Sequence, residues 1–352
     1  MADPALDFPD PYRAIRRWLW IVFLAIGVMI ALGGITRLTG SGLSMVEWRP
    51  LMGALPPMNH GEWERVFARY QQSPQYAQVN SWMQLADFQR IFFWEYFHRL
   101  FGRLIGLLVF APWLYFMVRR RLSGRLAWRV FGALLLGGAQ GLMGWVMVKS
   151  GLVNEPAVSH FRLAAHLLLA FVVAQYILWL ILDLSPRVVA PNEERADAKT
   201  RGGLVALLVL VVVQLAYGAF MAGTRAGWLS ATFPDMNGQY LPGAFFHSAD
   251  TIHEALNSPM AIHYIHRFLG WLVALVVIGF ALWVRRHGLP ERLWRVVRAM
   301  LLVTLIQFTL GALTVFLHVP IWLAVTHQLG GFALLSVMVA AMHAARPSRR
   351  IA

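Results

Sequence analysis

Cysteine is absent from the 352-residue chain. Disulfide bonds, iron–sulfur clusters and thiolate metal ligands are therefore excluded, and any metal or cofactor has to be held by His, Met, Asp, Glu or backbone groups. Charged residues are also scarce, at 14% of the chain, where an average soluble domain has about 25%. With 58% hydrophobic residues, this composition is typical of a protein that is solvated largely by lipid.

Acidic residues are the scarcer charged class, because there are 17 Asp and Glu residues against 31 Lys and Arg residues, for a net charge of +14. The basic residues occur in short groups between apolar runs and not in one continuous stripe, so we predict no nucleic-acid partner. The chain begins with Asp3, Asp7 and Asp10, which is atypical of a cleavable signal peptide. The first apolar run is therefore interpreted as a membrane anchor.

Long apolar runs dominate the rest of the chain. A membrane-spanning helix needs roughly 20 mostly apolar residues, and we predict an all-α integral membrane protein with eight transmembrane helices. The predicted spans lie near residues 18–36, 92–118, 127–148, 161–184, 203–222, 260–284, 296–318 and 321–343.

The basic groups fall mainly on one side of this predicted topology. They lie at both chain ends, in the segment 185–202 and in the two short connections that contain Arg121 and Arg285. Lys and Arg accumulate in cytoplasmic loops of membrane proteins. We therefore predict a protein of the cell inner (plasma) membrane, surrounded by membrane lipid, with both termini cytoplasmic.

Short motifs recur in the same order in the two halves of the chain. We therefore predict two pseudo-symmetric four-helix bundles, residues 1–184 and 203–352, joined by a cytoplasmic linker at 185–202. Because four spans separate the copies, the repeat is parallel, about an axis along the membrane normal. The matched pairs are 33–37 with 222–225, 95–100 with 263–268, Gln140 and Gly144 with Gln307 and Gly311, and 163–166 with 323–327.

Four histidines lie inside predicted spans at repeat-related positions: His98 and His166 in the first half, and His266 and His327 in the second. Ionisable residues at membrane depth normally face a bundle interior or a cavity. Two facing histidines in a four-helix bundle can ligate a haem iron from both sides, so we predict two haem sites near the non-cytoplasmic surface. For each single histidine the alternative is a packed side chain that bonds to neighbouring backbone. Zinc is less favoured, because no HExxH motif is present.

Glu95 precedes His98 by three residues and therefore lies on nearly the same helix face. We predict a catalytic acid–base role for it; a structural ion pair with Arg99 is the alternative. The second half has His263 at the equivalent position. This asymmetry indicates that one haem is acted on and the other passes electrons.

Several arginines lie at the depth of the predicted haem sites or at nearby span ends. Haem propionates need cationic partners, and the planar guanidinium group matches a carboxylate. Snorkelling to the membrane interface is the alternative for the span arginines, and a plain helix-end role is the alternative for the two that follow threonine. The candidates are Arg99, Arg103, Arg162 and Arg267, together with Arg37 and Arg225 after Thr36 and Thr224.

These motifs, taken together, resemble the haem A synthase family over nearly the whole chain. The matching segments are the Gly-Gly-Ile-Thr-Arg-Leu-Thr-Gly-Ser-Gly-Leu-Ser run at 33–44, Glu95-Tyr96-Phe97-His98-Arg99, His166, His263-Tyr264-Ile265-His266-Arg267 and Thr326-His327-Gln328. One branch of that family has a cysteine pair in its outer loops. This chain has none, so it looks like the mitochondrial-type, cysteine-free branch.

The resemblance implies that haem O is the substrate and that one porphyrin methyl group is oxidised in two steps to the formyl group of haem A. It implies that His98 and His166 hold the substrate haem beside Glu95, and that His266 and His327 hold a haem b. It also points to the haem O-producing farnesyltransferase as a partner. The electron acceptor and the oligomeric state, including a homo-oligomer, stay open.

Two other functions are compatible with paired histidines in a membrane bundle. One is a two-haem b-type electron-transfer cytochrome that oxidises quinol and modifies no haem. The other is a haem or small-molecule transporter, which an internal repeat also favours. Extraction of the pigments separates the three, because only the synthase converts haem O into a formyl-bearing haem.

Overall fold

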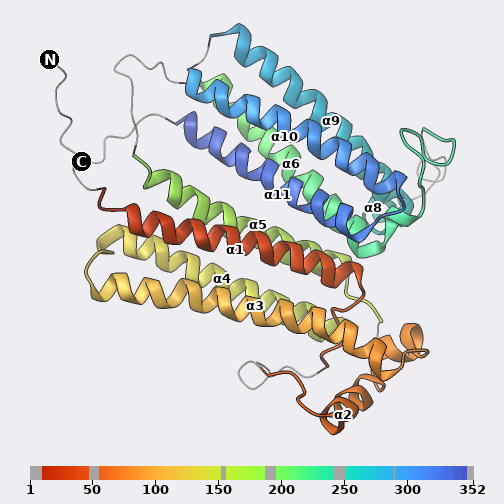
Figure 1. Ribbon diagram of the computed structural model, residues 1–352. Helices are drawn as coiled ribbons and strands as arrows, with labels where there is room; N and C mark the ends of the chain where they lie inside the picture. Colours follow the sequence, from red (N-terminus) through yellow and green to blue (C-terminus); the bar gives the residue numbers. More distant parts are fainter. Residues whose placement is uncertain are drawn as a thin grey trace.

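The computed structural model describes residues 10–46, 55–151, 156–186, 196–240, 250–288 and 290–346. Eight helices in these ranges are long and apolar enough to cross a membrane, which confirms the predicted number of spans. Figure 1 shows them lying side by side. They are α1 (Arg13–Leu38), α3 (Leu85–Val118), α4 (Gly124–Gly151), α5 (His160–Asp183), α6 (Ala198–Thr224), α9 (Pro259–Arg286), α10 (Glu291–Phe316) and α11 (Ile321–Ala344).

Several helices begin before the apolar run that predicted them, because a polar capping residue sets their first turn. α3 starts at Leu85, where Gln84 and Asp87 form a reciprocal capping box. α6 starts at Ala198, inside the predicted linker, because the side chain of Asp197 accepts a hydrogen bond of 2.8 Å from the amide of Thr200. Hydropathy locates the membrane-embedded part of a helix and not its solvated first turns.

Short helices occupy the two long connections at the end of the molecule opposite the start of α1. The first connection contains α2 (His60–Tyr70) and the π-helical turn η2 (Tyr76–Asn80), and the second contains η3 (Ala226–Trp228) and α8 (Thr251–Asn257). α2 and α8 are both at the right of Figure 1. In the first connection Tyr70 is fully buried and its ring stacks on Phe88 of α3 at 5.0 Å between centroids. The described part of the first connection therefore packs against α3.

The eight long helices form two groups of four. In the first group α1 and α4 each pack against both α3 and α5, so α3 and α5 lie across the group from one another. In the second group α6 and α10 each pack against both α9 and α11, which places α9 across from α11. The groups meet where α1 and α5 contact α11 and where α5 contacts α6.

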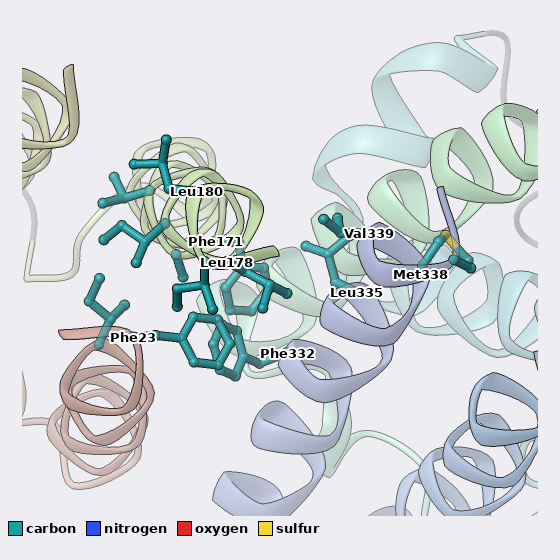
Figure 2. Close-up of a cluster of buried hydrophobic side chains, with 14 of the residues drawn as sticks. Phe23, Phe171, Leu178, Leu180, Phe332, Leu335, Met338 and Val339 are labelled. Atoms are coloured by element: carbon teal, nitrogen blue, oxygen red, sulfur yellow. The ribbon is translucent and has the colours of Figure 1, made fainter. Parts of the chain in front are cut away.

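An aromatic cluster fills the centre of the boundary between the groups. Phe332 of α11 stacks on Phe23 of α1 at 5.2 Å between ring centroids and lies 5.9 Å from Phe171 of α5. Figure 2 shows these rings together with Leu178 and Leu335, both buried. Aromatic pairs at these separations stabilise a packed interface beyond the area they bury.

Polar contacts also cross this boundary. Gln175 of α5 donates a hydrogen bond of 3.0 Å to Ser336 of α11. About two turns further along, at the C-terminal ends of the same helices, the carboxylate of Asp183 accepts from His343 of α11 at 2.9 Å. Within the first group it also accepts from Arg129 of α4 at 2.5 Å. The two halves are thus joined at several depths.

Large apolar side chains cover the outside of the helices. Leu107 and Leu114 of α3, Val209 of α6 and Leu275 of α9 are all exposed. A water-soluble protein rarely exposes apolar surface on this scale. The protein is therefore an integral membrane protein whose helices present these side chains to lipid.

Candidate functional site

His266 and His327 face one another across the second helix group. They come from the opposed helices α9 and α11, their ring centroids are 6.4 Å apart and their ring planes are nearly perpendicular, at 89°. Two imidazoles that bind one metal atom from opposite sides, each with a metal–nitrogen distance of about 2 Å, have centroids roughly 6 Å apart. The spacing of the pair would therefore suit a haem iron held between the two rings, with His266 and His327 as its protein ligands.

His98 and His166 occupy the corresponding opposed helices of the first group, α3 and α5. The Nδ1 atom of His98 is buried and has no hydrogen-bond partner in the described part of the chain. A buried imidazole nitrogen without a hydrogen-bond partner is unusual and is compatible with a ring that binds a ligand.

A glutamine from the neighbouring helix hydrogen-bonds to one histidine of each pair. Nε2 of Gln140 donates to the backbone carbonyl of His166 at 3.0 Å, and Nε2 of Gln307 donates to the carbonyl of His327 at 2.9 Å. In the sequence these glutamines are distinguished only as members of the repeat. Their recurrence four residues before a glycine in both halves was the signal that could have identified them.

Glu95 is 2% exposed and its carboxylate is held by three donors. The hydroxyl of Ser44 donates to Oε2 at 2.7 Å and the amide of Met45 to the same oxygen at 2.8 Å. Arg99, one turn along α3, donates to Oε1 at 2.5 Å and also to the carbonyl of Met45 at 3.1 Å. The ion pair with Arg99 is thus present, and it fastens the first outer connection to the helix that carries His98.

His263 is fully buried and makes the equivalent pair in the second group. Nε of Arg267 donates to Nε2 of His263 at 2.9 Å. The same guanidinium group donates to the carbonyls of Thr232 at 2.8 Å, Asp235 at 2.5 Å and Ser230 at 3.2 Å. Arg267 therefore fastens the second outer connection to the helix that carries His266.

Asp235 also forms hydrogen bonds within the second connection. Its carboxylate accepts from the amide of Gly238 at 3.2 Å, and the hydroxyl of Thr232 donates to the Asp235 carbonyl at 3.2 Å. Hydrogen bonding with the Thr232 side chain and with the Gly238 amide holds the pKa of Asp235 below its ordinary value. Its charge is therefore kept beside Arg267.

Arg37 joins the two helix groups. It donates from Nε to the carbonyl of Ala222 at 3.1 Å and from Nη2 to the carbonyl of Gly223 at 2.7 Å, at the end of α6. Arginines at a helix C-terminus satisfy carbonyls that lack a partner within the helix. Three of the six predicted propionate partners thus have backbone partners that the sequence did not predict. The other three are the half-buried Arg103 and the exposed Arg162 and Arg225.

Fold and site together define a polytopic, all-helical membrane protein that carries one histidine pair in each of two helix groups. The family profile described as cytochrome oxidase assembly protein matches residues 16–339. The chain is 39% identical over 330 residues to heme A synthase of Sphingopyxis alaskensis, covering 94% of this chain and 91% of that protein. It is 40% identical to heme A synthases of Nitrosospira multiformis, over 95% of this chain and 94% of that protein, and of Paracoccus denitrificans, over 95% and 88%. The chain belongs to the haem A synthase family.

Proposed function

We propose that the protein is a haem A synthase, a membrane oxidoreductase that converts a methyl group of haem O into the formyl group of haem A for terminal oxidases. Full-length similarity to heme A synthases supports this assignment. It disfavours a quinol-oxidising two-haem cytochrome and a haem transporter. Haem O comes from a farnesyltransferase reaction, so the enzyme that supplies it is the natural partner.

This proposal rests mainly on the two histidine pairs. His98 and His166 bind the iron of the substrate haem O, and His266 and His327 bind a resident haem b. The centroid separation of 6.4 Å in the second pair is the observation that supports axial ligation most directly. A bound haem b supplies one-electron redox chemistry, and the protein provides the ligands, the dry helix interior and the orientation.

Glu95 is the residue proposed to handle protons beside the substrate. It lies three residues from His98, hence on nearly the same face of α3. An ionised carboxylate has about four lone-pair sites, and the three donors leave acceptor capacity for a substrate proton or a water molecule. Because these donors fix the group, it is placed before the substrate arrives.

The six arginines divide into two groups in this proposal. Arg103 and Arg162 serve the propionates of the substrate haem, and Arg225 serves those of haem b. Arg99, Arg267 and Arg37 place the outer connections and the end of α6 around the sites through the backbone bonds described above, with further N–H donors on each guanidinium group for a propionate.

The proposed orientation places both termini in the cytoplasm and both histidine pairs toward the periplasmic side of the inner membrane. The distribution of Lys and Arg supports it. A reporter enzyme fused after Ala352 should be active in the cytoplasm, and activity confined to the periplasm would overturn this orientation.

Haem extraction tests the proposed activity. The chain is expressed in a bacterial strain that lacks its own haem A synthase, with and without a haem O-producing farnesyltransferase, and the membrane haems are separated by chromatography. We expect haem A only when both proteins are present, and none when His98→Ala replaces the wild-type chain at equal expression. Membranes that contain the wild-type chain and haem O but no haem A would contradict the assignment.

A further inference from the structure

Glycines lie against the rings of the two histidines on α5 and α11. A Cβ atom added to Gly144 of α4 would lie 3.0 Å from Cε1 of His166. A Cβ atom added to Gly311 of α10 would lie 2.8 Å from Cε1 of His327. Side chains in close-packed interiors do not tolerate such distances without movement, so each imidazole occupies space that only glycine leaves open.

α4 and α10 also contact the backbone of these histidines, through a glutamine one turn before each glycine. Gln140 precedes Gly144 by four residues and Gln307 precedes Gly311 by four, so each pair lies on one face of its helix. The glutamine amides donate to the carbonyls of His166 and His327 at 3.0 and 2.9 Å. Each histidine thus contacts a glutamine amide at its main chain and a glycine at its ring, and in the first half the Gln140 amide also lies 3.2 Å from Nδ1 of His166.

A third glycine supports this arrangement in the second half. Gly330 of α11 follows His327 by three residues, and a Cβ atom placed there would overlap Oε1 of Gln307. The side chain of Gln307 therefore lies flat against α11, in the position from which it reaches the His327 carbonyl. The opposed histidines, His98 and His266, also face glycines, at the longer added-Cβ distances of 3.3 Å from Gly33 and 3.1 Å from Gly218.

We propose that Gln140 with Gly144, and Gln307 with Gly311, are positioning residues that set the depth and the ring orientation of one axial ligand in each haem site. This inference rests on the proposed haem ligation by the histidines. Groups just outside a metal's ligands fix ligand orientation and tune the metal, and their loss typically lowers metal affinity or activity by about 10–100-fold. In the second half, Gln307 and Gly311 preserve the nearly perpendicular orientation of the His266 and His327 rings.

The test uses full-length protein purified with its resident haem. Crossed and parallel imidazole planes give different low-spin ferric signals in electron paramagnetic resonance, so this spectrum reports ring orientation. In Gly311→Ala we expect a shifted signal, a shifted midpoint potential and haem affinity about 10–100-fold weaker. Gln307→Leu, which keeps the side-chain size and removes only the amide, should shift the same properties in smaller degree. If Gly311→Ala does not fold, Gln307→Leu alone tests the positioning role.

Two glycines serve as controls: Gly141, one turn before Gly144 on its own helix, and Gly279 of α9. Within the described residues, an added Cβ at either would meet no atom from outside its own stretch of helix within 4 Å. Gly141→Ala and Gly279→Ala should leave the spectrum and the potential unchanged. A wild-type spectrum and potential in both Gly311→Ala and Gln307→Leu, with haem lost from His327→Ala, would overturn the positioning role while the ligation stands. A wild-type spectrum in His327→Ala would instead refute the ligation on which it rests.

Discussion

The pairs Glu95–Arg99 and His263–Arg267 occupy the same repeat position in the two halves. The two arginines make similar contacts, whereas their partners differ in chemistry. Each arginine is one turn beyond its partner and binds backbone carbonyls of an outer connection. The shared task is to fasten that connection over a histidine pair.

The difference between the pairs lies in the chemistry of the partner. In the first half a buried carboxylate accepts hydrogen bonds from Ser44, Met45 and Arg99. In the second half Nε2 of His263 accepts a bond from Arg267, so this nitrogen is occupied as an acceptor. At this repeat position the first half has a carboxylate, Glu95, where the second half has His263, which is why we propose that the chemistry takes place in the first half.

The largest expected effect comes from removing a ligand from one half at a time. His266→Ala or His327→Ala should abolish the low-spin b-type absorption of the purified protein, because each leaves an iron with one protein ligand. His98→Ala should keep that absorption and form no haem A. Difference spectra of the reduced and oxidised proteins measure this, and unchanged spectra in both second-half variants would refute the division between the halves.

The arginines should differ in their effect on stability. Arg99→Gln leaves the buried Glu95 carboxylate without its cation, and breaking a buried ion pair costs about 3–5 kcal/mol. Arg267→Gln leaves an imidazole and backbone carbonyls unsatisfied, which costs about 1–3 kcal/mol. Thermal unfolding in detergent should therefore show the larger loss for Arg99→Gln.

A double variant sharpens this prediction. Combining Arg99→Gln with Glu95→Gln removes the uncompensated charge, so it should recover part of the lost stability. Arg162→Gln, at an exposed position, is the matched control and should change stability little. Equal losses for Arg99→Gln and Arg267→Gln, without recovery in the double variant, would show that the two pairs are energetically alike.

The smallest effect is expected for the hydrogen bond between Gln175 and Ser336 at the boundary between the halves. Gln175→Leu removes the bond to Ser336, and hydrogen bonds between membrane helices contribute on average about 0.6 kcal/mol. Phe332→Ala, in the aromatic cluster of Figure 2, should destabilise by about 3–5 kcal/mol. If Gln175→Leu is the more destabilising variant in the same unfolding assay, polar contacts and not the aromatic cluster hold the halves together.

Sequence patterns predicted the eight spans well, because length and hydropathy alone determine which segments cross lipid. They missed the first turns of α3 and α6, because hydropathy does not detect helix starts that polar capping residues determine. These residues are Gln84 and Asp87 for α3 and Asp197 for α6. The sequence patterns also did not single out Gly218, which lies against the ring of His266.

The partners of the candidate site residues could be predicted only in part. Arg99 beside Glu95 follows from helical spacing. Ser44 and Met45 lie some fifty residues from Glu95 in the chain, and no local pattern predicts that contact. The same holds for Arg37, whose carbonyl partners Ala222 and Gly223 are in the other half.

The central claim is that the first half carries the reaction, and the haem A content of membranes with Glu95→Gln or His263→Gln tests it most directly. Both variants are made at matched expression in cells that produce haem O. Glu95→Gln keeps the size of the side chain and the histidine ligands, yet should lower haem A formation by about 10²–10⁴-fold, the usual contribution of an acid–base group. His263→Gln should still form haem A, with at most an effect on haem b. Normal haem A in Glu95→Gln together with none in His263→Gln would contradict the account and assign the reaction to the second half.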